Sequence, residues 1–94
     1  MNLGEIDEEM EIRTQRDNVI VELRDELFRI QPRLPETWPT GALFQADLGI
    51  DSLDLVELVA RVEQRYGILI NDTDIPNFIS LDAMADHICA RMPT

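Results

Sequence analysis

Apolar residues recur at intervals of three and four positions in three stretches of the chain, and this pattern predicts three amphipathic helices. The first is predicted from about residue 12 to Ile30. It ends there because Pro32 restricts the preceding residue and lacks a backbone N–H donor. Arg16 interrupts its apolar face, and the acidic residues 1–11 are expected to form a frayed N-terminal extension. The apolar face consists of Ile12, Val19, Ile20, Leu23, Leu27 and Ile30.

The second helix is predicted from Ser52 to Tyr66, and Gly67 follows as a residue that easily takes the left-handed conformation ending a helix. At about 100° per residue, one face of this helix collects its larger apolar side chains and is expected to face the core. That face consists of Leu55, Leu58, Val59, Val62 and Tyr66.

The same helix carries a second apolar face, formed by Leu53, Val56 and Ala60, with Glu57 and Glu63 beside it. A helix packed on one side of a small domain needs only one such face. Either the second face packs under a loop, or it is a surface for partner proteins.

The third helix is predicted to start after Ser80, which is a good N-cap residue. Its core face consists of Leu81, Met84, Ala85, Ile88 and Met92. Residues 68–70 are expected to form an extended link with Ile68 and Ile70 pointing inward. A short helix follows from about residue 73 to 78, with residues 71–74 supplying caps rather than a loose divalent-cation site.

Residues 31–47 form a long loop punctuated by three prolines and Gly41. Four apolar residues are expected to anchor it to the helices, with Trp38 as a plug on the core and residues 42–44 in a single helical turn. The anchors are Leu34, Trp38, Leu43 and Phe44. The fold class predicted is all-α, an antiparallel four-helix bundle with three long helices and one short one in a single domain, residues 1–94.

The net charge of the chain argues against some classes of binding partner. Nineteen acids against eight bases, all of them arginine, give a net charge of −11, which argues against binding nucleic acid or anionic membranes and favours basic protein partners. Cys89 is the only cysteine and His87 the only histidine, and there is no lysine, so few nucleophile–base pairs exist for an enzyme. A single cysteine, the lack of a signal-peptide pattern and the lack of a membrane-length apolar run predict a cytoplasmic protein.

Candidate chemistry lies at the start of the second helix. Asp51 is a good N-cap, and Asp54 lies three residues later, as the second half of a capping box would. If Asp51 caps the helix, the hydroxyl of Ser52 is left exposed at a helix N-terminus, where a phosphate is favoured. By itself, Asp-Ser is more often an ordinary helix start than a modification site.

The sequence around Ser52 closely resembles the prosthetic-group attachment motif of acyl carrier proteins. The motif is Leu48-Gly49-Ile50-Asp51-Ser52-Leu53-Asp54 followed by Val56-Glu57-Leu58, and the resemblance extends from about Ala42 to Ile88. It implies a non-catalytic carrier in which Ser52 bears a 4′-phosphopantetheine arm that holds acyl groups as thioesters. It also implies the acyl-carrier-type bundle with its long first loop.

The resemblance further implies functional residues. Asp51 would help a phosphopantetheinyl transferase and its Mg²⁺ engage. Enzymes with basic docking patches would bind the second helix through Leu53, Asp54, Val56, Glu57, Ala60 and Glu63. An acyl chain would fold back into a cleft lined by Leu55, Val59, Ile70 and Phe78.

The chain departs from the family pattern on this helix. Ala60 replaces a larger apolar residue, Gln64 replaces a frequent acid, and Arg61 and Arg65 interrupt the acidic face. These changes indicate partners other than the family's usual set and a specialised pathway rather than bulk fatty-acid synthesis. The resemblance itself implies a carrier for fatty-acid, lipid or polyketide synthesis, and the protein is expected to be a monomer. The alternatives are an aminoacyl or peptidyl carrier, and an acidic helical interaction module without a cofactor.

Overall fold

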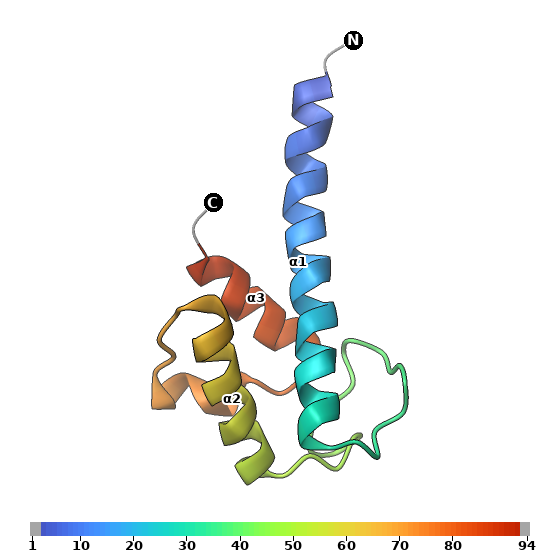
Figure 1. The fold of residues 1–94 in the computed structure, drawn as a ribbon, viewed down its shortest axis with the longest axis vertical. Helices are drawn as coiled ribbons and strands as arrows, with labels where there is room; N and C mark the ends of the chain where they lie inside the picture. The colour runs from blue at the N-terminus through green and yellow to red at the C-terminus, as the bar shows by residue number, and fades with distance from the viewer. Residues whose placement is uncertain (1–2, 93–94) are drawn as a thin grey trace.

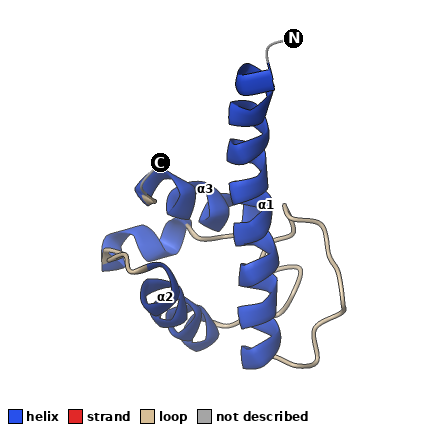
Figure 2. Ribbon diagram, turned by 45° about the horizontal axis from the view of Figure 1, so that its top comes forward, coloured by secondary structure: helices blue, strands red, loops and turns tan. Residues whose placement is uncertain are grey.

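The computed structural model describes residues 3–92, with side chains described from Gln15 onward. This part of the chain contains four helices, which are joined by loops: α1 (Leu3–Ile30), α2 (Ser52–Tyr66), the 3₁₀ helix η1 (Asp72–Asn77) and α3 (Leu81–Arg91). Residues 3–92 contain no strand, so the all-α prediction is confirmed (Figures 1 and 2). α1 packs on both α2 and α3, and α2 also contacts η1.

α1 is longer than its apolar face predicted. It begins at Leu3, so residues 3–11, expected to fray, belong to the helix, and Figure 1 shows this end extending beyond the other helices. Fraying in solution stays a prediction, and Met1 and Asn2 lie outside the described residues. The helix ends at Ile30, as predicted from Pro32.

One apolar core joins the helices, and most residues of the predicted faces belong to it. Ile30 and Met92 are only partly buried, and the side chain of Ile12 lies outside the described residues. In α2 all the predicted core residues are buried except Tyr66, which is half-buried. Burial raises the pKa of the Tyr66 hydroxyl, and its hydrogen bond to Glu22 raises it further, so this phenol stays a neutral donor between α2 and α1. The other buried residues include Leu23 and Leu27 of α1 and Met84 and Ile88 of α3.

The long loop is anchored as expected at three of its four apolar residues. Leu34, Trp38 and Phe44 are buried, and Phe28 packs edge-on against the Trp38 ring at 5.8 Å between centroids. Leu43 is 39% exposed, so its predicted anchoring was wrong. The predicted helical turn lies later, at about residues 43–48, and the backbone carbonyl of Leu43 accepts from the N–H groups that close it.

The link after α2 follows the predicted alternation. Gly67 ends α2 with φ of 64°, after which Ile70 is buried, Ile68 is partly buried and Leu69 is 81% exposed. The short helix is of the 3₁₀ type and starts at Asp72. Its N-cap, Asn71, makes no side-chain capping bond, so the capping role predicted for it was wrong.

α3 is held against α1 by the residue that interrupts the apolar face of α1. Arg16 donates to Asp82 at 3.0 Å and to Asp86 at 2.9 Å, so its charge bridges two helices rather than entering the core. The hydrogen bond from Arg16 lowers the pKa of Asp82. Ser80 caps α3 as predicted, its Oγ accepting from the N–H of Ala83 at 3.2 Å.

The single histidine and the single cysteine are both structural. His87 Nε2 accepts from Arg91 at 2.8 Å, and its ring packs edge-on against Phe78. Cys89 is half-buried, and burial raises the pKa of its thiol, which keeps it protonated and poorly nucleophilic.

Candidate functional site

The start of α2 is closed by a complete capping box. The carboxylate of Asp51 accepts from the N–H of Asp54 at 2.8 Å, and the carboxylate of Asp54 accepts from the N–H of Asp51 at 3.4 Å. Both capping roles expected from the sequence are therefore present. Because Asp51 supplies the cap, Ser52 is the first helical residue and has no capping task.

The turn before α2 sets the position of Ser52. Gly49 has φ of 69°, a left-handed conformation that a residue with a side chain would adopt only under strain. Directly after it, Ile50 is buried and its N–H donates to the carbonyl of Phe44 at 2.8 Å. The chain is thus anchored two residues before Ser52, whose side chain is exposed. A phosphate on that hydroxyl would meet the positive end of the α2 dipole without displacing a core residue.

Two residues of the long loop contact this site, and sequence analysis did not predict either contact. Gln31 donates to the Asp54 carboxylate at 2.9 Å, and its own oxygen accepts from Nε of Arg33 at 3.2 Å. A second nitrogen of Arg33 donates to the carbonyl of Gly49 at 3.2 Å. They lie about twenty residues before Ser52, so only the fold of the loop brings them to α2.

The predicted partner surface on α2 is exposed over most of its length. Leu53 is 78% and Val56 is 53% exposed, so packing under the loop does not occur. Ala60 and Glu57 are also exposed, whereas Asp54 is partly buried within the cap. Apolar side chains rimmed by carboxylates fit a basic partner surface with an apolar centre.

Glu63 differs from the other predicted partner residues. Its carboxylate accepts from the backbone N–H of Ile70 at 2.9 Å and so holds the link that follows α2. This bond occupies one carboxylate oxygen in the fold.

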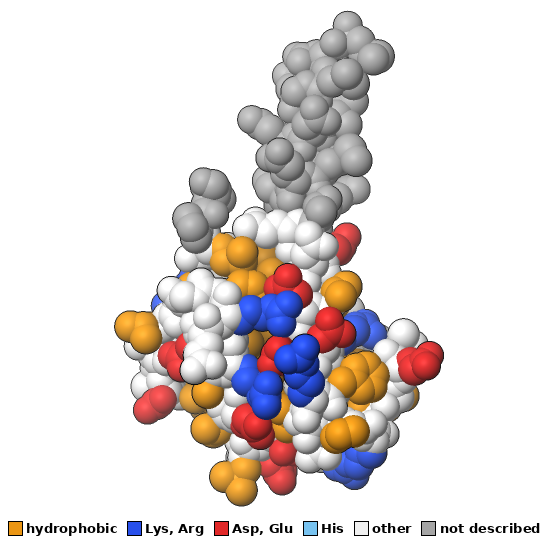
Figure 3. Space-filling view, viewed as in Figure 1, with side chains coloured by type: hydrophobic (Ala, Val, Ile, Leu, Met, Phe, Trp, Pro, Cys, Tyr) orange, Lys and Arg blue, Asp and Glu red, His pale blue; other side chains and the backbone are white. Residues whose placement is uncertain are grey.

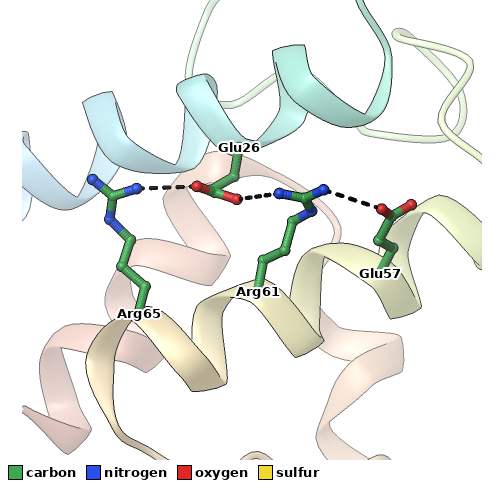
Figure 4. Close-up of polar contacts among 4 residues, drawn as sticks. All are labelled: Glu26, Glu57, Arg61 and Arg65. Atoms are coloured by element: carbon green, nitrogen blue, oxygen red, sulfur yellow. Dashed lines mark hydrogen bonds and ion pairs between the residues drawn. The ribbon is translucent and has the colours of Figure 1, made fainter.

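The two arginines that interrupt the acidic face of α2 turn toward α1. Arg61 and Arg65 bind the two carboxylate oxygens of Glu26 at 3.1 and 3.0 Å, and Arg61 also donates to Glu57 (Figure 4). Glu26 is only 6% exposed, and a buried carboxylate needs such partners. Figure 3 shows basic and acidic side chains alternating where α1 and α2 meet. The arginines therefore serve the packing of α2 on α1 and leave the face around Leu53 acidic and apolar.

An apolar pocket of about 290 Å³ opens between the long loop, the start of α2 and η1. Of the four predicted cleft residues, Leu55 and Phe78 line it. Val59 and Ile70 are not among its lining residues and are buried in the core. Sequence reasoning missed the other lining residues, which come from the long loop, the turn before α2, η1 and the segment after it: Leu43, Phe44, Gln45, Ala46, Ile50, Pro76 and Ile79.

The described residues contain neither a cluster of metal-binding side chains nor a helix that could span a membrane. Their histidine, cysteine, aspartate and glutamate side chains include no group of three or more arranged to hold a metal ion. None of the helices in the described part combines the length and the apolar character needed to cross a bilayer.

This chain is similar in sequence to a known protein family and to several known proteins. Residues 35–88 match the family model described as "Phosphopantetheine attachment site". The acyl carrier protein of Campylobacter hominis is 34% identical over 70 residues, which cover 74% of this chain and 89% of that protein. The acyl carrier protein of Onion yellows phytoplasma is 40% identical over 50 residues, 53% of this chain and 66% of that protein.

A mitochondrial relative is similar over a shorter share of its length. Acyl carrier protein 2, mitochondrial, of Arabidopsis thaliana is 43% identical over 50 residues, 53% of this chain, but the match spans only 40% of that protein. The chain therefore corresponds to part of this relative and to most of the Campylobacter protein.

Proposed function

The chain belongs to the acyl carrier protein family, whose members bear a covalent 4′-phosphopantetheine, and we propose that Ser52 is the residue that carries this group. The observation that carries the proposal is the capping geometry. Asp51 alone supplies the N-cap, so the adjacent hydroxyl of Ser52 is exposed and available for a bond to phosphorus. We further propose that the helices pack as the antiparallel bundle of this family.

The residues present fit a phosphopantetheine group. Ser52 offers a hydroxyl, and the free N–H groups of the first turn of α2 favour an anion beside it. The apolar pocket, lined by Leu55 of α2, lies close to the same helix end. When bound, the group supplies a terminal thiol that holds an acyl group as a thioester.

The chain's own part is to present cargo, and we propose that it is a carrier rather than an enzyme. A cargo attached through Ser52 is tethered to whichever enzyme binds α2, and tethering raises its effective concentration there. The rigid cap at Asp51 and the buried Ile50 hold the attachment point still. Asp51 would, in this proposal, also face the transferase and its metal.

Partners are expected to be basic proteins that dock on α2. These are a phosphopantetheinyl transferase and the enzymes that load, extend or transfer acyl groups in fatty-acid, lipid or polyketide synthesis. Exposed Leu53 and Val56 would fill an apolar pocket of the partner, and Glu57 would meet its cations. The net charge of −11 supports steering toward such proteins rather than toward nucleic acid or membranes.

Three further properties of the carrier are proposals: its monomeric state, its cytoplasmic location and the acyl class of its cargo. A monomeric state and a cytoplasmic location are expected from the sequence, and size-exclusion chromatography and cell fractionation test them; the Arabidopsis relative is named as mitochondrial. Acyl rather than aminoacyl or peptidyl cargo is favoured by the motif sequence Leu48-Gly49-Ile50-Asp51-Ser52-Leu53-Asp54. A cofactor-free interaction module remains the outcome if no arm attaches.

We also propose that the pocket shelters the acyl chain. Its lining is mostly apolar, and its volume of about 290 Å³ is at the small end for ligand pockets, so a short chain fits best. Loading a short acyl group onto the arm is expected to shift the backbone amide resonances of Leu55 and Phe78. Val59 lies in the core away from the pocket lining and is expected to shift less. Unchanged resonances of Leu55 and Phe78 would count against the pocket.

Mass spectrometry tests the attachment site. Wild-type protein incubated with coenzyme A, Mg²⁺ and a permissive phosphopantetheinyl transferase is expected to gain the mass of one phosphopantetheine. Fragmentation of the digested product is expected to place that mass on the peptide containing Ser52. An adduct on another residue, or no adduct on folded protein with the transferase of the same source, contradicts the proposal.

A further inference from the structure

Arg33 lies beside the proposed attachment point in surroundings that are otherwise acidic. Asp47, Asp51 and Asp54 all lie within five residues of Ser52. Among the side chains that the structure describes, Arg33 is the only cation hydrogen-bonded to residues 47–54. A phosphodiester on Ser52 would add one more negative charge here, and like charges at such distances repel.

The hydrogen bonds of Arg33 leave it suited to bind an anion. Its guanidinium has five N–H donors, of which one binds the Gln31 oxygen at 3.2 Å and another the Gly49 carbonyl at 3.2 Å. The remaining donors have no protein acceptor among the described residues, and the side chain is exposed. A planar guanidinium with free donors is the side chain best matched to two phosphate oxygens.

Gln31 fixes this arginine to the cap of α2. Its amide donates to Asp54 at 2.9 Å while its oxygen accepts from Arg33, so the cap and the arginine form one connected network. Gly49 lies three residues before Ser52, and consecutive Cα atoms are 3.8 Å apart, so their Cα atoms are at most about 11 Å apart. The guanidinium and a phosphate on the Ser52 side chain are thus within reach of each other.

From this placement we propose that Arg33, positioned by Gln31, binds the phosphodiester on Ser52 and holds the base of the arm against the long loop. The proposal rests on the attachment proposed above. It assigns Arg33 a role toward the arm and separates it from Arg61 and Arg65, which are engaged with α1.

The test compares apo and holo protein for wild type, Arg33→Gln and Arg29→Gln. Arg29 is an exposed arginine in the last turn of α1, so its replacement removes the same charge away from the network. In wild type and Arg29→Gln, the holo-minus-apo difference in Tm is expected to be the same. In Arg33→Gln it is expected to fall by roughly 1–8 °C, the effect of one exposed charge-assisted contact in a domain of this size.

Phosphorus NMR of the holo proteins gives a second measurement. The phosphodiester resonance is expected to move in Arg33→Gln and to stay in place in Arg29→Gln, with Arg33→Lys lying between because lysine keeps the charge but not the planar fork. A purely structural role for Arg33 would lower the Tm of apo and holo protein equally and leave the resonance unmoved, which overturns the proposal. An arm found on a residue other than Ser52 overturns the attachment proposal as well, so the two failures are distinct.

Discussion

Ser52→Ala is expected to abolish the attachment of phosphopantetheine while leaving the fold intact. The phosphodiester requires the Oγ atom, and alanine has none, so no mass gain is expected at any incubation time. Because Asp51 supplies the cap and Ser52 is exposed, the free energy of unfolding is expected to change by no more than about 0.5 kcal/mol. Intact mass after incubation with coenzyme A, Mg²⁺ and transferase, together with a circular-dichroism melt, checks both expectations.

Ser80→Ala is the matched control, since Ser80 is the only other serine in the chain. Its Oγ caps α3, so its loss is expected to lower stability by about 0.5–2 kcal/mol, yet the folded variant is expected to gain the arm. The assignment of Ser52 is wrong if Ser52→Ala gains the same mass as wild type.

Leu58→Ala is expected to destabilise the protein by about 2–5 kcal/mol, a large part of the stability of a small domain. Leu58 is fully buried in α2 between the other core residues, so alanine leaves a cavity there. Urea denaturation should show the loss as a lower midpoint at an unchanged slope, because a mutation that alters stability alone leaves the slope unchanged.

Leu53→Ala makes the same chemical change five residues earlier, on the exposed face. Leu53 is 78% exposed, so a stability change within about 0.5 kcal/mol is expected. The loss should instead appear in docking, as a fall of roughly tenfold in the rate at which the transferase modifies the protein. Equal destabilisation by the two variants would show that the face around Leu53 is packed in solution, and would remove the basis for the partner surface.

Local rules made α2 and α3 predictable. Asp51, Ser80 and Gly67 are residues whose preference for helix ends does not depend on distant contacts, and the structure places all three where the sequence did. The core faces of α2 and α3 were also predictable without knowledge of distant contacts, because helical periodicity alone decides which side chains share a face. Boundaries were less certain where periodicity was weak, as at the start of α1, which begins at Leu3.

The tertiary structure decided what the long loop does. Nothing in its sequence showed that Leu43 would line a pocket instead of the core, or that Gln31 and Arg33 would return to the cap of α2. These contacts join residues up to 23 positions apart, and no helical or strand period relates them.

For the charged residues too, the sequence predicts one part and the tertiary structure decides the other. The sequence by itself determined an acidic chain, its helices, and the exposed Ser52 within a family motif. It indicated that Arg61 and Arg65 interrupt an acidic face, but only the packing of α1 on α2 showed that both bind the buried carboxylate of Glu26. Periodicity assigns a side chain to a face of its own helix, whereas the partner of a charge depends on which helix packs against that face.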